Sequence, residues 1–293
     1  MINQNNFKLV EYNNVPYPAG YSAEIKEIAA HFDKSEIEIA DQYSLHTEYS
    51  YGKRKFDSAL WAVFSEIAAS HKDGIPQLWK SDKWAFEFAE FILILTKDRN
   101  PPAVIEIHPP FNDYCTFDDF AERYCIFEKR IRSVYPETVI VIENRAGTIY
   151  RGGRFLVGKA SEIADLCERI KQNSLNLGIV LDFPQLLTAE NIDPLKFKAE
   201  KYQEAINTIL PYRDLIKGIH LWGKKKSATG RWVAHAGNLN TYFDCNNETK
   251  EVFLSGISQI CNDETVRFLV PEVNTGLDDL ADIIHDLNTI FRR

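Results

Sequence analysis

The sequence of 293 residues predicts an α/β fold, and the expected architecture is a closed (β/α)8 barrel. Short apolar runs rich in β-branched residues alternate along the chain with longer amphipathic stretches, which is the pattern of successive βα units. Several of the short runs are almost continuously apolar, as expected for parallel strands covered on both faces. Successive runs also end on an ionisable side chain, which is typical of strands whose carboxyl ends meet at one barrel mouth.

Seven segments have the character of strands. They are Phe7–Glu11, Glu36–Ala40, Ala103–His108, Thr138–Glu143, Leu177–Asp182, Gly218–Trp222 and Val266–Glu272. A closed barrel of this class needs eight strands. The interval 53–100 is too long for one crossover, so the sequence predicts that the missing strand lies there.

Six stretches between these segments carry apolar residues at helical spacing. Thr116, followed by Asp118 and Asp119, predicts an acidic helix start, as does Ser161 followed by Glu162. The predicted helices are Ser58–Ser70, Lys83–Thr96, Phe117–Val134, Ser161–Gln172, Lys201–Leu210 and Leu277–Phe291.

The composition limits the function classes. The longest apolar run, Phe91–Leu95, is far shorter than the ~18 residues of a membrane span, and no export signal is expected at the N-terminus. Five cysteines without a CxxC motif favour reduced thiols and a cytoplasmic location. The net charge of −8 argues against a nonspecific polyanion binder, although it is compatible with one local basic face. No linker or repeat interrupts residues 1–293, which predicts a single domain.

Several familiar chemistries lack their motifs. The glycines of Gly147–Gly158 form neither a GxGxxG nor a P-loop pattern, and no GxSxG occurs. His31, His71 and His285 fall in helical or helix-end contexts, so we expect them to be surface residues.

Five of the apolar runs finish on a side chain that can bind a metal. In a parallel barrel these ends surround one mouth, and crowded carboxylates and imidazoles repel one another unless a cation neutralises them. Oxygen and imidazole ligands suit Mn, Zn, Fe or Mg, and the absence of cysteine argues against a structural thiolate zinc. A single strand-end Asp, Glu or His is commonly a cap or a hydrogen-bonded residue, but the joint pattern favours a metal site. Its members are His108, Glu143, Asp182, His220 and Glu272.

The series Glu143, Asp182, His220 and Glu272 resembles the metal set of the xylose-isomerase-like TIM barrels. That superfamily holds sugar isomerases and epimerases together with apurinic/apyrimidinic endonucleases of the endonuclease-four type and UV-damage endonucleases. The resemblance covers most of the chain. Its motifs Ile-Glu-Asn and Leu-Asp-Phe-Pro are shared across the superfamily and do not choose a branch.

Two further segments resemble the endonuclease branch. His46, in Ser-Leu-His-Thr-Glu-Tyr, looks like the early histidine ligand of those enzymes, and Ile-His-Pro-Pro at His108 resembles their His-Pro strand end. Two ions about 3.5 to 4 Å apart suit in-line phosphodiester hydrolysis. The resemblance implies one Zn or Mn ion at His46, His108 and Glu143, and a second at Glu143, Asp182, His220 and Glu272.

The chain departs from the family at a third metal position. The family often has Asp-x-x-His, whereas Gln185 stands three residues after Asp182. In Arg-Trp-Val-Ala-His-Ala-Gly, Val233 takes the place of the usual aspartate. His235 of this segment would bind metal, contact substrate or cap the loop.

Basic residues follow one of the proposed ligands closely. Lys224, Lys225, Lys226 and Arg231 lie in the loop after His220. They form either a solvated loop or a phosphate clamp, since an anionic substrate approaches a negative protein through a local positive patch.

Other side chains near the mouth are candidates for substrate contact. Arg145 lies two residues beyond a proposed ligand, and Gln185 is a further candidate. Tyr49, Trp222 and Trp232 would either stack on a sugar or base or pack within the protein.

Three functions remain open. In a phosphodiesterase acting on damaged or abasic DNA, Glu143 bridges two ions and Glu272 or Asp182 holds one of them. In a sugar or sugar-phosphate isomerase or epimerase, one ion is held and Glu143 and Glu272 act as base and acid, while His46 and His108 contact hydroxyls. The third alternative is a barrel that binds a ligand without catalysis. One or two Zn or Mn ions are the expected cofactor of either enzyme.

Overall fold

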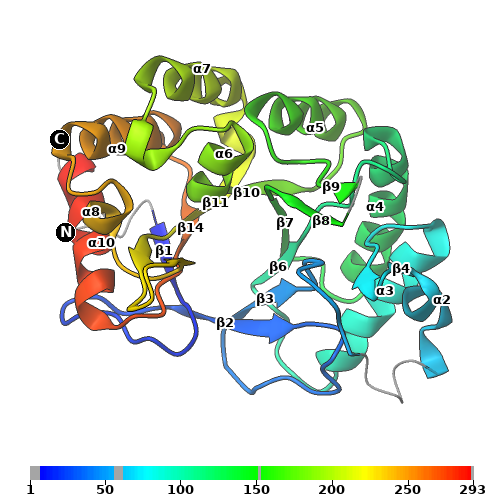
Figure 1. Cartoon of the computed structure of the whole chain (residues 1–293). Coiled ribbons are helices and arrows are strands. Elements are labelled where there is room, and N and C mark those ends of the chain that lie inside the picture. Colours follow the sequence, from blue (N-terminus) through cyan, green and yellow to red (C-terminus); the bar gives the residue numbers. More distant parts are fainter. Residues whose placement is uncertain (1–6, 56–61, 151–152, 292–293) are drawn as a thin grey trace.

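The computed structural model describes residues 7–55, 62–150 and 153–291. Its centre is a closed barrel of eight parallel strands in the order β1, β14, β11, β10, β7, β6, β3, β2, with helices around it (Figure 1). The predicted (β/α)8 barrel is therefore confirmed. The strands are β1 (Phe7–Glu11), β2 (Ile25–Ala30), β3 (Tyr43–Thr47), β6 (Val104–Ile107), β7 (Val139–Glu143), β10 (Gly178–Asp182), β11 (Ile216–Leu221) and β14 (Arg267–Pro271).

The helices lie outside the barrel. The predicted start at Thr116 is confirmed, because its hydroxyl accepts from Asp119 N at 3.2 Å while the Asp119 carboxylate accepts from Thr116 N at 2.9 Å. The long helices are α3 (Asp82–Leu95), α4 (Phe117–Arg132), α5 (Ala160–Gln172), α7 (Ala199–Ile209), α9 (Asn247–Cys261) and α10 (Leu277–Ile290). The short ones are α2 (Ser65–Ala69), α6 (Phe183–Ala189), α8 (Leu239–Tyr242) and the 3-10 turns η1 (Pro194–Lys196) and η2 (Leu210–Leu215). Within the described ranges, no helix combines the length and apolar character needed to cross a bilayer.

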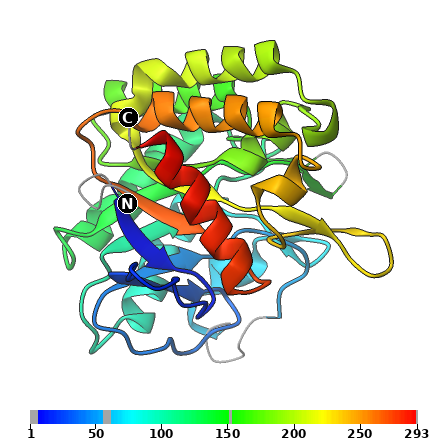
Figure 2. The same ribbon diagram turned by 90° about the vertical axis from the view of Figure 1, so that its left-hand side faces the viewer.

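Three small hairpins decorate the loops. They are β4–β5 (His71–Lys72 and Ile75–Pro76), β8–β9 (Thr148–Tyr150 and Gly153–Arg154) and β12–β13 (Lys224–Lys226 and Trp232–Ala234). The β12–β13 hairpin projects from the body of the molecule beside α8 (Figure 2).

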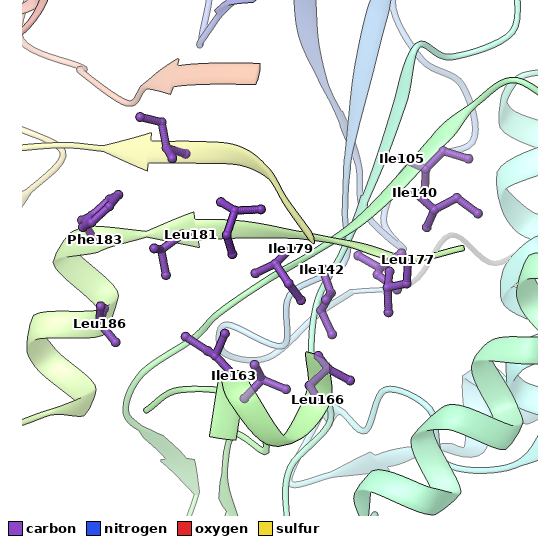
Figure 3. Close-up of a cluster of buried hydrophobic side chains, with 14 of the residues drawn as sticks. Ile105, Ile140, Ile142, Ile163, Leu166, Leu177, Ile179, Leu181, Phe183 and Leu186 are labelled. Carbon is purple, nitrogen blue, oxygen red and sulfur yellow. The ribbon is translucent and has the colours of Figure 1, made fainter. Parts of the chain in front are cut away.

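Strand alternation separates an apolar outer face from a polar interior. Side chains such as Ile142 and Ile179 point outward, toward Ile163 and Leu166 of α5 (Figure 3). The alternate residues point into the barrel, where Val104, Val141 and Val180 form a separate apolar cluster. Because successive side chains on one face are two residues apart, the next inward positions are Glu106, Glu143 and Asp182. On these three strands, the inward side chains thus change from apolar to ionisable between one inward position and the next.

The first third of the barrel differs from the prediction. Glu36–Ala40 is not a strand, and Ile39 is 72% exposed. The chain instead supplies two strands, β2 and β3, on either side of that segment. β2 was missed because Lys26 and Glu27 interrupt its apolar pattern, yet Glu27 lines the cavity inside the barrel.

The interval 53–100 contains no barrel strand among its described residues. It holds α2, the β4–β5 hairpin and α3, so the predicted position of the eighth strand is wrong. The predicted helix Ser58–Ser70 corresponds to α2 in its second half, while 56–61 lie outside the described residues.

Helix α9 was not predicted at all. Its Gly256 breaks the apolar pattern, and the structure explains that glycine: a Cβ there would lie 2.4 Å from the hydroxyl of Tyr202 on α7. The close packing of α7 on α9 therefore requires glycine at this position.

Candidate metal centre

Four neighbouring strands deliver buried ionisable side chains to one place. β6, β7, β10 and β11 are consecutive in the barrel, and the register pairs Asp182 directly with His220. Glu143, Asp182 and His220 are each no more than 1% exposed. The structure thus brings together the strand-end residues at the C-terminal mouth, as the sequence predicts.

The first group of candidate ligands comprises His46, Glu106, His108 and Glu143. One ligand atom from each lies within 4.8 Å of all the others. His108 Nε2 is 2.9 Å from Glu143 Oε2, and His46 Nε2 is 3.6 Å from Glu106 Oε1. The group contains the three predicted residues and adds Glu106.

The second group comprises Glu143, Asp182 and His220, again with ligand atoms within 4.8 Å of one another. His220 Nδ1 is 3.8 Å from Glu143 Oε1, and its Nε2 is 3.1 Å from Glu106 Oε2. Glu143 belongs to both groups, with Oε2 toward His108 and Oε1 toward His220. The geometry is therefore that of two adjacent groups of candidate ligands that share one carboxylate.

Glu272 lies beside the second group. Its Oε1 is 3.4 Å from His220 Nδ1, and its Oε2 is 3.2 Å from His235 Nδ1. His235 stacks on Trp222 with ring centroids 4.6 Å apart. His235 thus contacts a predicted ligand and is not a member of either described group.

Several buried carboxylates lie close together in the barrel interior and raise the pKa values of some of their neighbours. Burial raises the pKa of Asp182 well above its usual value, and Glu143 and Glu272 raise it further. Burial likewise raises the pKa of Glu27, with Glu106 adding to the effect. Ionising all of these groups together is unfavourable without positive charge between them.

Two members of the centre hold their charge because of neighbours. Burial would raise the pKa of Glu143, but Arg145 and His108 hold it well below its usual range. Burial would lower the pKa of His220, but the carboxylates of Glu106 and Glu272 hold it well above its usual value. The Glu143–Arg145 contact is 3.4 Å, between Oε2 and Nη1.

Unsatisfied buried atoms test whether the residues fit a cation. Buried polar atoms are normally hydrogen-bonded, so each exception calls for an explanation. Several such exceptions converge on this centre, and they are oxygen and imidazole atoms of the kind that bind Zn or Mn. Among the described residues, the buried atoms that have charged neighbours at ion-pair distance but no well-aligned hydrogen bond are Glu106 Oε1, His220 Nδ1 and Nε2, His235 Nδ1 and Glu272 Oε2. The donor set fits one or two divalent ions.

A cavity of about 850 Å³ opens beside the centre. Of the predicted substrate-contact residues, Arg145, Gln185, Trp222 and Arg231 line it. Gln185 Oε1 accepts from Ala146 N at 3.1 Å. The fifth, Lys224, is not among the lining residues. It lies over the rings of Trp222 and Tyr242, with Nζ 5.5 and 5.6 Å from their centroids.

Several polar side chains of this cavity or centre were not predicted from the sequence, among them Glu106, Glu27, His31 and Tyr12. Glu106 lies on β6, two residues before His108, which follows the strand, so period-two alternation could have identified it. Glu27 and His31 were missed together with β2, and Tyr12 follows the end of β1. His31 was expected on the surface, but it lines the cavity, and burial lowers its pKa to about 4.

The fold and the site define a (β/α)8 barrel with a buried carboxylate and imidazole centre at its C-terminal mouth. No family model and no curated protein matches the chain. Among solved structures, the chain is similar to that of AsfvAP:AG, at 12% identity and a TM-score of 0.49 over 85% of this chain and 84% of that one. It is also similar to the GH53 catalytic domain of Ignisphaera aggregans, at 11% identity and a TM-score of 0.38 over 81% and 66%. A third is oxaloacetate acetylhydrolase with the product oxalate, at 11% identity and a TM-score of 0.33 over 79% and 68%. At these values the likeness carries no information on activity.

Proposed function

We propose that this barrel is a divalent-metal-dependent hydrolase of phosphodiesters, with damaged or abasic DNA as its substrate class. The observation that carries the proposal is the presence of two ligand groups that share Glu143. Paired ions bridged by one carboxylate are the arrangement used for in-line displacement at phosphorus.

The residues would divide between two ions. His46, Glu106, His108 and Glu143 would hold one, and Glu143, Asp182 and His220 would hold the other, with Glu272 beside it. Zn or Mn suits this mixture of imidazole and carboxylate donors. When bound, such ions supply Lewis acidity and neutralise charge that develops on the phosphate.

Arg145 is a half-buried cation in contact with the centre. Its guanidinium lines the cavity, contacts Glu143 and lies 5.1 Å from the ring centroid of Tyr49. Its Nε has no hydrogen-bond partner. This nitrogen would donate to a phosphate oxygen, and the planar guanidinium suits that role.

The β12–β13 hairpin would guide an anionic substrate. Lys225, Lys226 and Arg231 are exposed, and no ion pair within the described residues engages them. Arg231 and Trp232 also line the cavity. In a chain of net charge −8, this hairpin is a local positive element beside the centre.

A nicking assay tests the proposal. Metal-replete protein is incubated with an oligonucleotide that carries one abasic site, beside the same sequence without the lesion. We expect cleavage at the lesion that chelator abolishes and Zn or Mn restores. Normal occupancy by two ions with no cleavage of either oligonucleotide would refute the phosphodiesterase.

One observation favours a second function, the isomerisation or epimerisation of a sugar or sugar phosphate. Glu143 Oε1 and Glu272 Oε1 lie 3.8 and 3.4 Å from the same atom, His220 Nδ1. Two carboxylates therefore lie beside one site and could serve as base and acid. A panel of sugars and sugar phosphates tests it. Turnover with one ion per chain would favour the isomerase, and two ions with neither reaction would favour a barrel that only binds ligand.

A further inference from the structure

The outer ring nitrogen of His108 is held by a backbone carbonyl. Nδ1 lies 3.2 Å from Glu48 O, while Nε2 lies 2.9 Å from Glu143 Oε2. A carbonyl only accepts hydrogen bonds, so Nδ1 carries a proton in this contact. Ligand histidines almost always donate their second ring nitrogen in this way, which leaves Nε2 for the ion. The carbonyl of Glu48 therefore sets the state in which His108 can bind metal.

The direction of that carbonyl is set by the side chain of the same residue. The peptide between Glu48 and Tyr49 is planar and trans, so its N–H points away from its C=O. That N–H donates to Glu48 Oε1 at 3.1 Å. By holding the N–H, the carboxylate aims the carbonyl at His108.

The carboxylate of Glu48 is itself fully engaged. It is 0% exposed and accepts five hydrogen bonds. Arg54 supplies two of them, from Nε at 2.8 Å and Nη2 at 3.0 Å. Backbone N–H groups of Phe32, Tyr49 and Ser50 supply the others, at 3.3, 3.1 and 3.2 Å.

The network also stabilises an unusual backbone conformation. Ser50 has φ 55°, in the left-handed region that a non-glycine residue seldom adopts. Its hydroxyl donates to Pro76 O at 2.8 Å and its N–H donates to Glu48. The loop after β3 is thus held in one strained arrangement, as is common where a side chain or carbonyl must be aimed.

The strand end that carries His108 is held separately. Trp79 Nε1 donates to His108 O at 2.8 Å, and Thr47 Oγ1 donates to Glu106 O at 2.7 Å. These bonds fix the backbone of β6 and the residue after it. What they leave free is rotation of the imidazole, and the Glu48 carbonyl restrains that rotation.

We propose that the Glu48–Arg54 ion pair is a positioning device for His108, which holds Nδ1 as a donor to the Glu48 carbonyl and so fixes the ring plane, and the tautomer that an ion would meet. The inference rests on the proposed metal centre of His46, Glu106, His108 and Glu143. Neither residue of the pair touches the ion or the substrate phosphate in this account. Their effect passes through one peptide unit.

The substitution Glu48→Gln tests the proposal. All five partners of Glu48 are donors, so the amide nitrogen of glutamine would face at least one of them and the carboxylate network would rearrange. We expect the metal-free variant to lose the hydrogen bond from His108 Nδ1 to the Glu48 carbonyl, which selects this tautomer, observed through ¹⁵N imidazole shifts. We also expect the first ion to bind about 10- to 100-fold more weakly in chelator competition, as for other groups that orient a ligand.

Arg54→Lys serves as the conservative variant. Lysine keeps the charge but lacks the two-pronged contact, so we expect an intermediate loss of affinity and a partly retained tautomer. Glu87→Gln is the matched control, because Glu87 is also a buried carboxylate that accepts two backbone N–H bonds, from Glu66 and Ile67 at 2.9 and 3.0 Å. It lies on α3, so its substitution should leave the tautomer and the affinity unchanged.

Three outcomes are decisive. An unchanged His108 tautomer and unchanged affinity in a folded Glu48→Gln variant would overturn the positioning role. An equal loss of affinity in Glu87→Gln would also overturn it, because the effect would then reflect stability alone. If the tautomer changes as expected but the unaltered protein does not cleave abasic DNA, the positioning role stands and only the proposed phosphodiesterase fails.

Discussion

The two ligand groups differ in the protonation of their histidines and in the hydrogen bonds that orient their side chains. In the first group, burial and His108 lower the pKa of His46 well below its usual value, so His46 is neutral at pH 7. In the second group the pKa of His220 is raised, so His220 carries a proton in the metal-free protein. Within the second group, hydrogen bonds orient the carboxylate of Asp182, which accepts from Gln185 N and Trp222 Nε1, both at 2.8 Å.

This difference has a chemical consequence. Imidazole must lose its proton to bind an ion, so an ion enters the first group without displacing one from His46, whereas it must displace one at His220. In the proposed centre the two sites share Glu143 yet would couple differently to pH. In the first group His46 is already neutral and ready to bind an ion. In the second group His220 becomes neutral only when the ion displaces its proton.

The largest expected effect would remove both sites at once. Glu143→Gln takes away the ligand that belongs to both groups of described residues, and we expect the affinity for both ions to fall by more than ~100-fold, beyond the loss typical of orienting groups. Metal analysis after gel filtration measures the remaining ions per chain. Two ions retained in this variant would show that Glu143 does not join the sites.

Removing one ligand from each group should separate the sites. We expect His46→Asn to retain an ion at Asp182 and His220, and His220→Asn to retain one at His46 and His108. Each variant should bind one ion instead of two, measured by the same metal analysis. Loss of both ions from either variant would mean that the groups form a single cooperative site.

The pH dependence should differ between the two ions. Because the pKa of His220 is raised in the metal-free protein, affinity for the second ion should fall as pH drops below that pKa, by up to about tenfold per pH unit, with release of one proton on binding. The first ion should show a much weaker dependence near neutrality, since His46 is already neutral. Calorimetry in buffers of different ionisation enthalpy counts the protons. Equal proton release at both sites would contradict the comparison.

A smaller effect should follow from loosening the second carboxylate. Trp222→Phe removes the donor to Asp182 Oδ2, and we expect about tenfold weaker binding of the second ion alone. Trp232→Phe, on the exposed hairpin strand β13, is the control and should bind both ions normally. A change at the first site in Trp222→Phe would indicate that the two groups are not independently held.

The smallest effect concerns the hairpin. Replacing Lys225 and Lys226 by alanine should leave both ions in place and reduce the salt dependence of abasic DNA binding by about one unit of slope per lysine. Fluorescence anisotropy at several salt concentrations measures it. An unchanged slope would show that these lysines form a solvated loop.

The sequence predicted most of the barrel because strand and helix periodicities differ. Buried strands such as Val139–Glu143 and Gly178–Asp182 are continuous apolar runs that end on a carboxylate, so both their type and their last residue were accessible. β2 could not be predicted in this way, because Glu27 points into the barrel and its charged neighbours there are not visible in the sequence. A charged residue in such a segment indicates an exposed position. α9 was lost for a related reason, because Gly256 serves a contact with α7 that only the fold reveals.

Site residues could be predicted only where a side chain that can bind metal stands at the end of an apolar run. His108, Glu143, Asp182 and His220 satisfy both conditions, and the structure gathers them. Glu106 lies within a strand and Glu48 acts through its own backbone, so neither could be identified from residue type. Long-range arrangements such as the Glu48 carbonyl meeting His108 depend on the pairing of β3 with β6.

Crystals of metal-replete protein, measured at the absorption edge of the bound metal, test the central claim most directly. We expect two anomalous peaks, both within ligand distance of Glu143, one next to His46 and His108 and the other next to Asp182 and His220. A single peak, or two peaks of which only one touches Glu143, would contradict it.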